Sequence, residues 1–252
     1  MLVSVDWLKD HLTDPDVVIL DSRPKTMFLY GHLPNAQSLS IEQVIRFDEF
    51  GSNLVIEQEK IVKLFGGLGI DESKTVLLIG DAMDPSVARI VWTFLYFGHE
   101  KTCLLNTNAS DLQKHGLKLT RQTLIQKPTK FTPKINNDLR IESDLLKHHL
   151  NDFEILDARS HQEFMSGHLP NSKLIPFSEG IDYNGNLFRD KRFLNELFLQ
   201  NNVSKDKEII CYCMHGHRAS NLFLQLKIAG FDNVKLYDGS FVEWNGKKLP
   251  LE

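Results

Sequence analysis

Length, composition and charge describe an ordinary globular chain and exclude several classes of function. The chain has 252 residues, of which 42% are hydrophobic, so it can bury one large core or two cores of common size. A net charge of −4 offers no basic surface to a phosphate backbone, and we expect no nucleic-acid partner. No segment has the length of a membrane span, and the charged start MLVSVDWLKDHL does not suit a secretory signal. The three cysteines lack a spacing typical of disulfides, which fits a reducing compartment. We therefore expect a cytoplasmic protein with no membrane partner.

The chain contains an internal repeat. The segment LDSRPKTMFLYGHLPNA at residues 20–36 returns as LDARSHQEFMSGHLPNS at residues 156–172, at a constant offset of 136. A weaker match relates residues 75–106 to residues 207–238 at an offset of 132, so the second copy is four residues shorter in its middle. The repeat predicts two domains of the same kind.

The stretch between the two copies has the composition of a linker. Residues 121–139 contain two prolines and several lysines and threonines, without sustained periodicity. We therefore predict an inactive domain over residues 1–120, a linker over 121–139 and a catalytic domain over 140–252. Because a pair of like domains can bury its own interface, we expect a monomer.

Short apolar runs alternate with helical patterns in both copies, and they are clearest in the second. In chain order we expect a helix over 141–150, strands over 153–158 and 174–177, a helix over 192–201, a strand over 208–213, a helix over 218–230 and a strand over 233–239. Strands that alternate with helices imply an α/β fold, with a mainly parallel sheet flanked by helices in each domain. Sites in such folds usually form at the ends of the strands.

The GHLPN segments and the Asp-x-Arg triplets have a structural interpretation, because both features occur in each copy. Glycine, histidine and proline after an amphipathic stretch suit a tight turn, in which we expect His32 and His168 to hydrogen-bond the backbone. A carboxylate at a strand end, Asp21 or Asp157, can accept hydrogen bonds from loop N–H groups, with the arginine two residues later as its counter-charge.

The sequence IICYCMHGHRAS at residues 209–220 points most directly to chemistry. If EIICY is a central strand and Arg218 begins the next helix, the residues between them must reverse direction in a short arc. Successive N–H groups then line a nest at a helix N-terminus, which favours an anion. Cys213 lies at the mouth of this nest, where the field, helped by Arg218 and by His215 or His217, favours a thiolate over a thiol. A nucleophilic sulfur follows.

The first copy serves as an internal control for this interpretation. At the offset of 132, Cys213 corresponds to Asp81 and Gly216 to Asp84. An aspartate cannot serve as a sulfur nucleophile, and two acidic groups would disfavour an anion in the nest. We therefore predict that the first copy keeps the fold without the chemistry.

Together these features resemble the tandem-domain rhodanese family of thiosulfate and 3-mercaptopyruvate sulfurtransferases, with an inactive first domain and an active second one. The resemblance rests on the Asp-x-Arg and Gly-His-Leu-Pro-Asn segments of both halves, on the loop from Cys213 to Arg218 and on the ending LYDGSFVEW at residues 236–244. It implies two rhodanese-like α/β domains and a sulfurtransferase that needs no cofactor and no metal.

The resemblance also implies roles for individual residues. Cys213 would take a sulfane sulfur from a small anionic donor, hold it as a persulfide and pass it to an acceptor. Arg218 would add charge and close the loop. The implied donors are thiosulfate or 3-mercaptopyruvate, and the implied acceptors are cyanide or a thiol, such as glutathione or a thioredoxin-like protein. The implied substrate-binding residues are Met214, His215, Gly216, His217 and Arg218.

The sequence departs from the family pattern in two places. The loop CMHGHR differs from the Cys-Arg-Lys-Gly-Val-Thr of thiosulfate-type members and from the Cys-Gly-Ser-Gly-Val-Thr of mercaptopyruvate-type members, and it is closer to single-domain rhodaneses. In addition, Glu163 lies about where tandem members often have a substrate-binding arginine. The choice of donor therefore stays open.

Three alternatives remain open from the residues themselves. A phosphatase or arsenate reductase would use five residues between its cysteine and arginine, whereas four separate Cys213 from Arg218. A zinc or copper site in CYCMHGH would require neighbouring residues to converge tetrahedrally. A non-catalytic interaction module is the third alternative, against which the retained Cys213, Gly216 and Arg218 argue. Cys211 and Cys103 lie in apolar strands and are expected to be packing residues.

Overall fold

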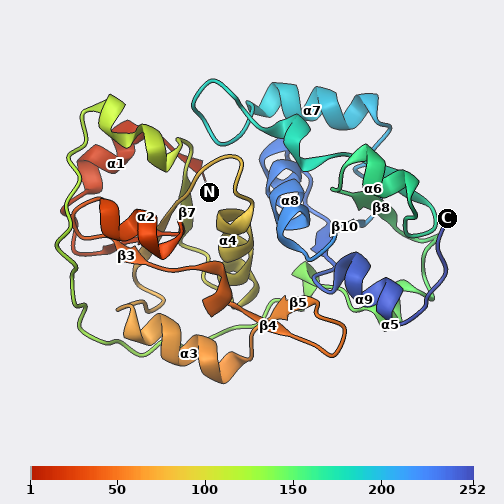
Figure 1. Ribbon diagram of the computed structural model, residues 1–252, viewed down its shortest axis with the longest axis horizontal. Helices are drawn as coiled ribbons and strands as arrows, with labels where there is room; N and C mark the ends of the chain where they lie inside the picture. The colour runs from red at the N-terminus through yellow and green to blue at the C-terminus, as the bar shows by residue number, and fades with distance from the viewer. Residues whose placement is uncertain (1) are drawn as a thin grey trace. The chain divides into compact units, whose positions relative to one another are not determined.

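The computed structural model describes residues 2–252 and divides them into two compact units (Figure 1). Unit 1 comprises residues 2–44, 56–135 and 182–187. Unit 2 comprises residues 45–55, 136–181 and 188–252. Each unit therefore contains one short segment from the other half of the sequence. No helix within residues 2–252 is long and apolar enough to cross a membrane.

Unit 1 is built on a five-stranded parallel sheet in the order β1-β7-β6-β2-β3. The strands are β1 (Leu2–Val3), β2 (Val17–Asp21), β3 (Gln37–Ser38), β6 (Thr75–Ile79) and β7 (Thr102–Leu105). The accompanying helices are α1 (Val5–His11), α2 (Lys25–Tyr30), α3 (Gln58–Gly67) and α4 (Ser86–Tyr96), with 3-10 segments η1 (Ile41–Gln43) and η2 (Ala109–His115). The central strands β2 and β6 are continuous apolar runs because both faces of a parallel sheet are covered.

Unit 2 is built on a four-stranded parallel sheet in the order β11-β10-β8-β9. The strands are β8 (Glu154–Asp157), β9 (Ser172–Leu174), β10 (Ile209–Tyr212) and β11 (Val234–Leu236). The helices are α5 (Ser143–Leu146), α6 (His161–Met165), α7 (Lys191–Gln200), α8 (His217–Ala229) and α9 (Ser240–Gly246), with 3-10 segments η3 (Asn137–Leu139) and η4 (Phe177–Gly180). The two parallel sheets flanked by helices confirm the predicted α/β class.

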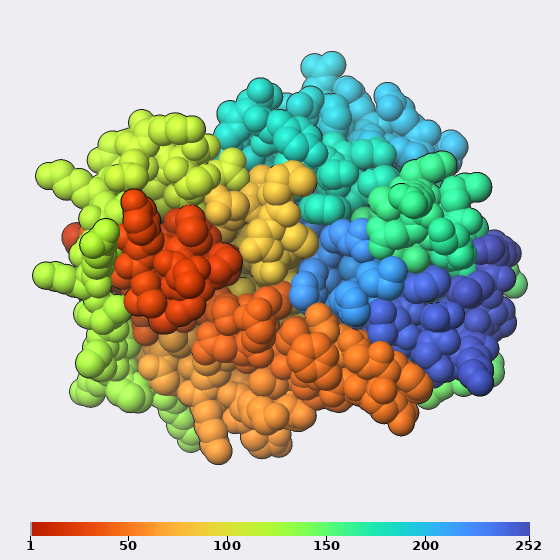
Figure 2. All heavy atoms as spheres, in the orientation of Figure 1, coloured from red at the N-terminus to blue at the C-terminus, as the bar shows by residue number. Residues whose placement is uncertain are grey.

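An antiparallel hairpin from the first copy of the repeat completes unit 2. It consists of β4 (Ile45–Phe47) and β5 (Asn53–Val55). The backbone N–H of Val55 donates to the buried carboxylate of Asp238 at 2.8 Å, and the ring of Phe50 packs against the backbone of Gly246. Figure 2 shows the orange atoms of this hairpin beside the dark blue atoms of the C-terminal segment.

Several element boundaries in unit 2 differ from the sequence prediction for physical reasons. The strand expected over 174–177 ends at Leu174, because Pro176 lacks an N–H group for the ladder and precedes a 3-10 turn. The helix expected over 141–150 is only the single turn α5. Helix α8 ends as predicted before Gly230, which adopts the left-handed conformation with φ 90°. Helix α9 was not predicted.

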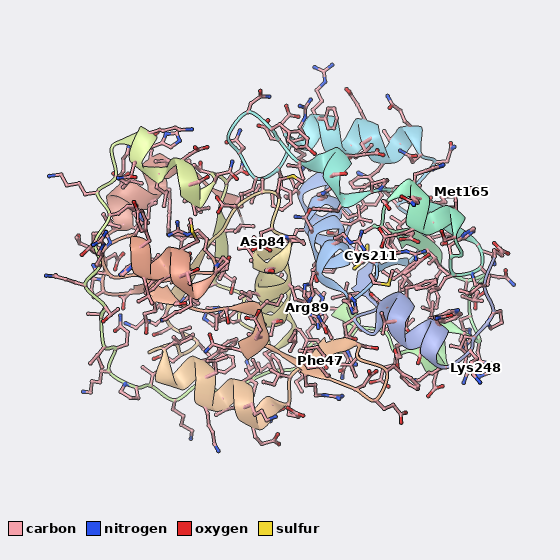
Figure 3. All side chains as sticks on the ribbon, viewed as in Figure 1. Phe47, Asp84, Arg89, Met165, Cys211 and Lys248 are labelled. Atoms are coloured by element: carbon pink, nitrogen blue, oxygen red, sulfur yellow. The ribbon has the colours of Figure 1, made fainter. Side chains whose placement is uncertain are left out.

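The core of unit 2 fixes the position of the segment that follows β10. Strand β10 lies between β8 and β11, and all four of its residues are buried. Helix α8 follows directly and is buried over most of its length, even at polar positions such as Ser220 and Gln225. Figure 3 labels Cys211 on β10 inside the unit and Met165 at the exposed end of α6. A strand and a helix with so little freedom hold the loop between them in one place.

Candidate active site

The loop between β10 and α8 places Cys213 at a helix N-terminus, as the sequence predicts. The backbone N–H of Gly216 donates to Cys213 Sγ at 3.1 Å. Gly216 has φ 87°, a left-handed conformation that glycine adopts without steric cost, and α8 begins at the next residue, His217. The first N–H groups of a helix have no partner within the helix, so this end of α8 favours negative charge. The sulfur itself is buried, with the residue 1% exposed.

The start of α9 holds the backbone of Cys213 from the other side. Ser240 Oγ accepts a hydrogen bond from the Cys213 N–H at 3.1 Å and donates to the carbonyl oxygen of Tyr237 at 2.8 Å. The N–H of Phe241 donates to the Cys213 carbonyl oxygen at 2.9 Å. Both polar backbone groups of Cys213 are therefore held by one short helix. Ser240 lies in the segment LYDGSFVEW, and nothing in the spacing of this segment pointed to its bond with Cys213.

Arg218 is bound to a carboxylate beside the cysteine loop. Its two terminal nitrogens donate to the two oxygens of Glu163 at 2.6 and 2.7 Å. The hydrogen bond from Arg218 lowers the pKa of Glu163 to about 2, and hydrogen bonds from the backbone and the hydroxyl of Ser160 contribute to this shift. Glu163 also completes a capping box with Ser160 at the start of α6. Glu163 was expected only as a departure from the family pattern, and its pairing with Arg218 could not be predicted from the sequence.

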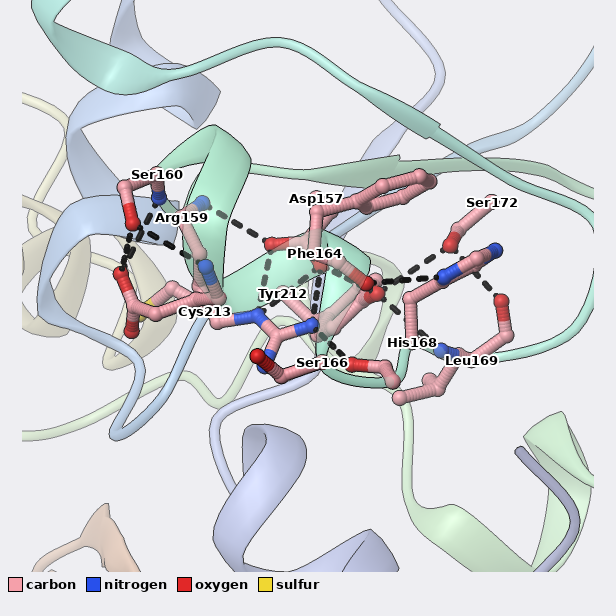
Figure 4. Close-up of polar contacts among 12 residues, drawn as sticks. Asp157, Arg159, Ser160, Phe164, Ser166, His168, Leu169, Ser172, Tyr212 and Cys213 are labelled. Carbon is pink, nitrogen blue, oxygen red and sulfur yellow. Dashed lines mark hydrogen bonds and ion pairs between the residues drawn. The ribbon is translucent and has the colours of Figure 1, made fainter. Parts of the chain in front are cut away.

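The Asp-x-Arg triplet of unit 2 forms a buried network under the loop (Figure 4). Arg159 Nη2 donates to Asp157 Oδ2 at 2.7 Å and to the carbonyl oxygen of Gly167 at 2.8 Å. The hydroxyl of Tyr212, the last residue of β10, donates to Asp157 Oδ2 at 2.5 Å. The Arg159 guanidinium also lies 4.1 Å from the ring centroid of Phe241. The arginine charge is therefore compensated by a buried carboxylate at the end of β8.

The same architecture occurs in unit 1, which confirms the structural interpretation of both repeated motifs. Arg23 pairs with Asp21 at 2.6 Å. His32 and His168 each contact the carbonyl oxygen four residues earlier through Nδ1, at 2.8 and 3.1 Å. The strand registers match Tyr212 with Ile79, so Gly80 stands at the position of Cys213 and the sequence match to Asp81 is one residue off. Asp81 is the next residue, and its carboxylate accepts a hydrogen bond from the backbone N–H of Ser110 in η2. Unit 1 therefore keeps the scaffold with a glycine in place of the cysteine.

The two histidines of the loop have different surroundings. His215 is exposed at the surface, but part of its side chain is buried. This partial burial is the larger cause that lowers its pKa, and the positive charge of Arg218 is the smaller one, so the neutral ring is favoured. His217 is the first residue of α8, and its Nε2 lies 2.8 Å from the amide nitrogen of Asn53 on β5. Asn53 is 164 residues away in sequence, so no local pattern could have identified it.

The remaining cysteines have packing roles, as predicted. Cys211 is fully buried. This burial raises the pKa of its thiol, and the charge of nearby Cys213 raises it further. Cys103 packs partly buried against the core of unit 1. All three cysteines are free thiols. Within residues 2–252, no three His, Cys, Asp or Glu side chains come together as a metal site would require.

A cavity of about 240 Å³ borders the loop at Met214. Its charged lining side chains, Arg159 and Glu163, both take part in the ion pairs described above. The exposed lining is mainly apolar, with Met214 and Phe241 as its hydrophobic members. The complete lining consists of Arg159, Gln162, Glu163, Ser166, Met214 and Phe241.

Comparisons with known sequences agree with this arrangement. The family model of the rhodanese-like domain matches residues 4–114 and 142–247. The sulfur carrier protein TtuD of Thermus thermophilus is 31% identical over 97% of this chain and 93% of its own length. The 3-mercaptopyruvate sulfurtransferase of Escherichia coli is 27% identical over 99% of this chain and 97% of its own length.

Comparisons with solved structures find the same architecture. The crystal structure of SseA from Escherichia coli, described as a 3-mercaptopyruvate sulfotransferase with the rhodanese fold, superposes with a TM-score of 0.85 at 26% identity. It covers 96% of this chain and 98% of SseA. The structure of wild-type EanB superposes with a TM-score of 0.89 at 18% identity, and the match covers 100% of this chain and 68% of EanB. Because the identity is so low, this similarity shows the fold alone.

Proposed function

Because this chain belongs to the rhodanese-like family, with a matching domain in each half, we propose that it is a sulfurtransferase in which Cys213 carries the sulfur. It is related over its full length to 3-mercaptopyruvate and thiosulfate sulfurtransferases. The observation that carries the proposal is the hydrogen bond from the Gly216 N–H to Cys213 Sγ at the start of α8. Unit 1 has Gly80 at the corresponding position and no cysteine in this loop, so we assign the chemistry to unit 2 alone.

The proposed reaction has two displacement steps at sulfur. The Cys213 thiolate attacks the transferable sulfur of the donor, and a new S–S bond forms. The bond between this sulfur and the rest of the donor breaks, an S–S bond in thiosulfate and a C–S bond in 3-mercaptopyruvate, and sulfite or the pyruvate enolate leaves with the electron pair. An acceptor thiolate or cyanide then attacks the outer sulfur of the Cys213 persulfide, and the cysteine thiolate leaves. The Gly216 N–H and the N-terminus of α8 stabilise the negative charge on sulfur before and after each step.

The loop residues have proposed positions around this sulfur. We assign the backbone from Met214 to Arg218 to binding of the transferred sulfur, since these residues form the arc between Cys213 and the first turn of α8. Thiosulfate and 3-mercaptopyruvate are the donors to test first, because relatives are named for them. We propose a thiol, such as glutathione or a thioredoxin-like protein, or cyanide as the acceptor.

The proposal is tested by mass spectrometry of the intact protein after incubation with each donor. We expect one added sulfur on Cys213, with loss of the adduct and of transfer to cyanide in Cys213→Ser. Cys211→Ala and Cys103→Ala are the matched controls and should keep most of the activity, because neither thiol lies in the loop. Full transfer by Cys213→Ser, or an adduct on another cysteine, would refute the proposal.

A further inference from the structure

The positive charges that border the cysteine loop are compensated within unit 2. Arg218 is bound through both terminal nitrogens to Glu163. Arg159 is bound to Asp157, and both of these side chains are almost completely buried. His215 favours its neutral form, because partial burial and the Arg218 charge both oppose its protonation. A small anion that reaches the loop therefore meets backbone N–H groups without a free guanidinium beside them.

The Glu163–Arg218 pair would compete directly with an anionic donor. A divalent anion near Arg218 must either displace the carboxylate of Glu163 or lie close to its negative charge. Like charges that lie a few ångströms apart repel one another strongly in a partly desolvated site. Glu163 lies in the first turn of α6 and is fixed there by its bonds with Ser160, so it cannot simply swing away.

The cavity beside the loop favours a different kind of donor. Met214 directly follows Cys213, and the Phe241 ring stacks on the Arg159 guanidinium at 4.1 Å. These two side chains offer apolar surface to a carbon chain, whereas the ionised groups of the lining are already paired. A volume of about 240 Å³ is sufficient for a short organic group.

We propose that Glu163 is a specificity-determining residue that holds Arg218 and directs the site away from small dianionic donors toward persulfides whose organic group carries no charge, which react in their protonated form R–S–S–H. The inference rests on the proposed sulfur transfer by Cys213. The Cys213 thiolate attacks the outer sulfur of R–S–S–H, the new S–S bond forms, and R–S⁻ leaves with the electron pair of the broken S–S bond. The proton stays on the transferred sulfur, so the step needs no oxidant or reductant. The group R contacts Met214 and Phe241.

The test compares two donors on the wild type and on Glu163→Gln. The donors are thiosulfate, a dianion, and 2-hydroxyethyl persulfide, which carries no charge on its carbon chain. The rate of one-sulfur addition to Cys213 is followed by mass spectrometry as a function of donor concentration. Glutamine retains the capping box of α6 but removes the negative charge. We expect kcat/KM for thiosulfate to rise at least about tenfold, and that for the persulfide to change less than about threefold.

Glu142→Gln is the matched control, since it removes an exposed carboxylate in the same unit that pairs with Arg140 at 2.7 Å. It should leave the ratio of the two donors unchanged. The wild type alone provides a second measurement that requires no variant, because it should prefer the persulfide over thiosulfate by at least about tenfold. Equal use of both donors by the wild type, or an unchanged donor ratio in folded Glu163→Gln, overturns the inference. If the Cys213 adduct still forms in these experiments, the proposed function stands. No adduct from either donor overturns the proposed function and the inference together.

Discussion

Ser240 holds the backbone of Cys213 although it lies outside the cysteine loop. It is fully buried, adopts φ 55°, and bonds both the Cys213 N–H and the Tyr237 carbonyl oxygen. A non-glycine residue in the left-handed region costs roughly 1–2 kcal/mol, and it persists where surrounding bonds compensate for the strain. The hydroxyl therefore keeps the chain in a conformation that holds Cys213 at the start of α8.

Two substitutions at Ser240 separate the hydroxyl from the backbone conformation. Ser240→Ala leaves the buried Cys213 N–H without its acceptor, which costs about 1–3 kcal/mol, and keeps the strained φ. Ser240→Gly loses the same bond but relieves the strain, so it should be about 1 kcal/mol more stable than the alanine variant. Both should slow sulfur addition to Cys213. Urea unfolding monitored by circular dichroism measures the difference, and a glycine variant less stable than the alanine variant would argue against this account.

At the residue scale, the sequence singled out Cys213 as a candidate but did not identify the residues that surround it. Cys213 could be singled out because the repeat provides Asp81 as a comparison within one chain. The Asp-x-Arg pairs were also predictable, because their members are two residues apart. The partner of Arg218 is 55 residues away and depends on how α6 packs, so spacing carried no information about it.

At the scale of elements, strands and long helices were predictable where apolar periodicity is strong. Strand β10 and helix α8 were located to within about one residue, since a buried strand and a buried helix leave long apolar patterns. Helix α9 is only seven residues long and begins at a residue with positive φ, so it has neither a cap nor a pattern that a sequence reveals. The 3-10 turn at Phe177–Gly180 similarly replaced part of an expected strand.

The hairpin formed by β4 and β5 gives a prediction at the same scale. Asn53→Ala removes the side-chain contact with His217 Nε2 at the start of α8. A hydrogen bond of this kind contributes about 1 kcal/mol, which corresponds to roughly fivefold in rate if the contact positions the loop. We expect sulfur addition to Cys213 to slow by about that factor. Phe47→Ala, at an exposed position on β4, is the control. Equal rates for the two variants would remove Asn53 from any positioning role.

At the scale of the molecule, the Glu163–Arg218 pair makes stability depend on pH in a defined direction. The pKa of Glu163 is lowered from 4.5 to about 2, so the pair contributes fully above about pH 4.5 and is lost as pH falls toward 2. Because Glu163 is partly exposed, solvent screening reduces the contribution to about 1 kcal/mol. Glu163→Gln should therefore lower Tm at pH 7 and approach the wild type near pH 3. Thermal unfolding at several pH values checks this, and a constant difference down to pH 3 would contradict it.

The repeat predicted two domains of one α/β kind, and the fold and the family match agree with that prediction. The exchange of residues 45–55 and 182–187 between the units could not be predicted. Both segments are short, and their assignment depends on contacts such as that between Val55 and Asp238, which are separated by 183 residues. Periodicity describes local faces and contains no information about such distant pairings.

The exchanged hairpin has a consequence for how the chain is made. During synthesis the N-terminal half emerges first, so β4 and β5 leave the ribosome long before α9, against which Phe50 packs. The unit that carries Cys213 can reach its final packing only after the C-terminal helix has also emerged, and pairing over so large a sequence separation is slow. The surroundings of Cys213 are therefore completed last, after both the hairpin and α9 have emerged.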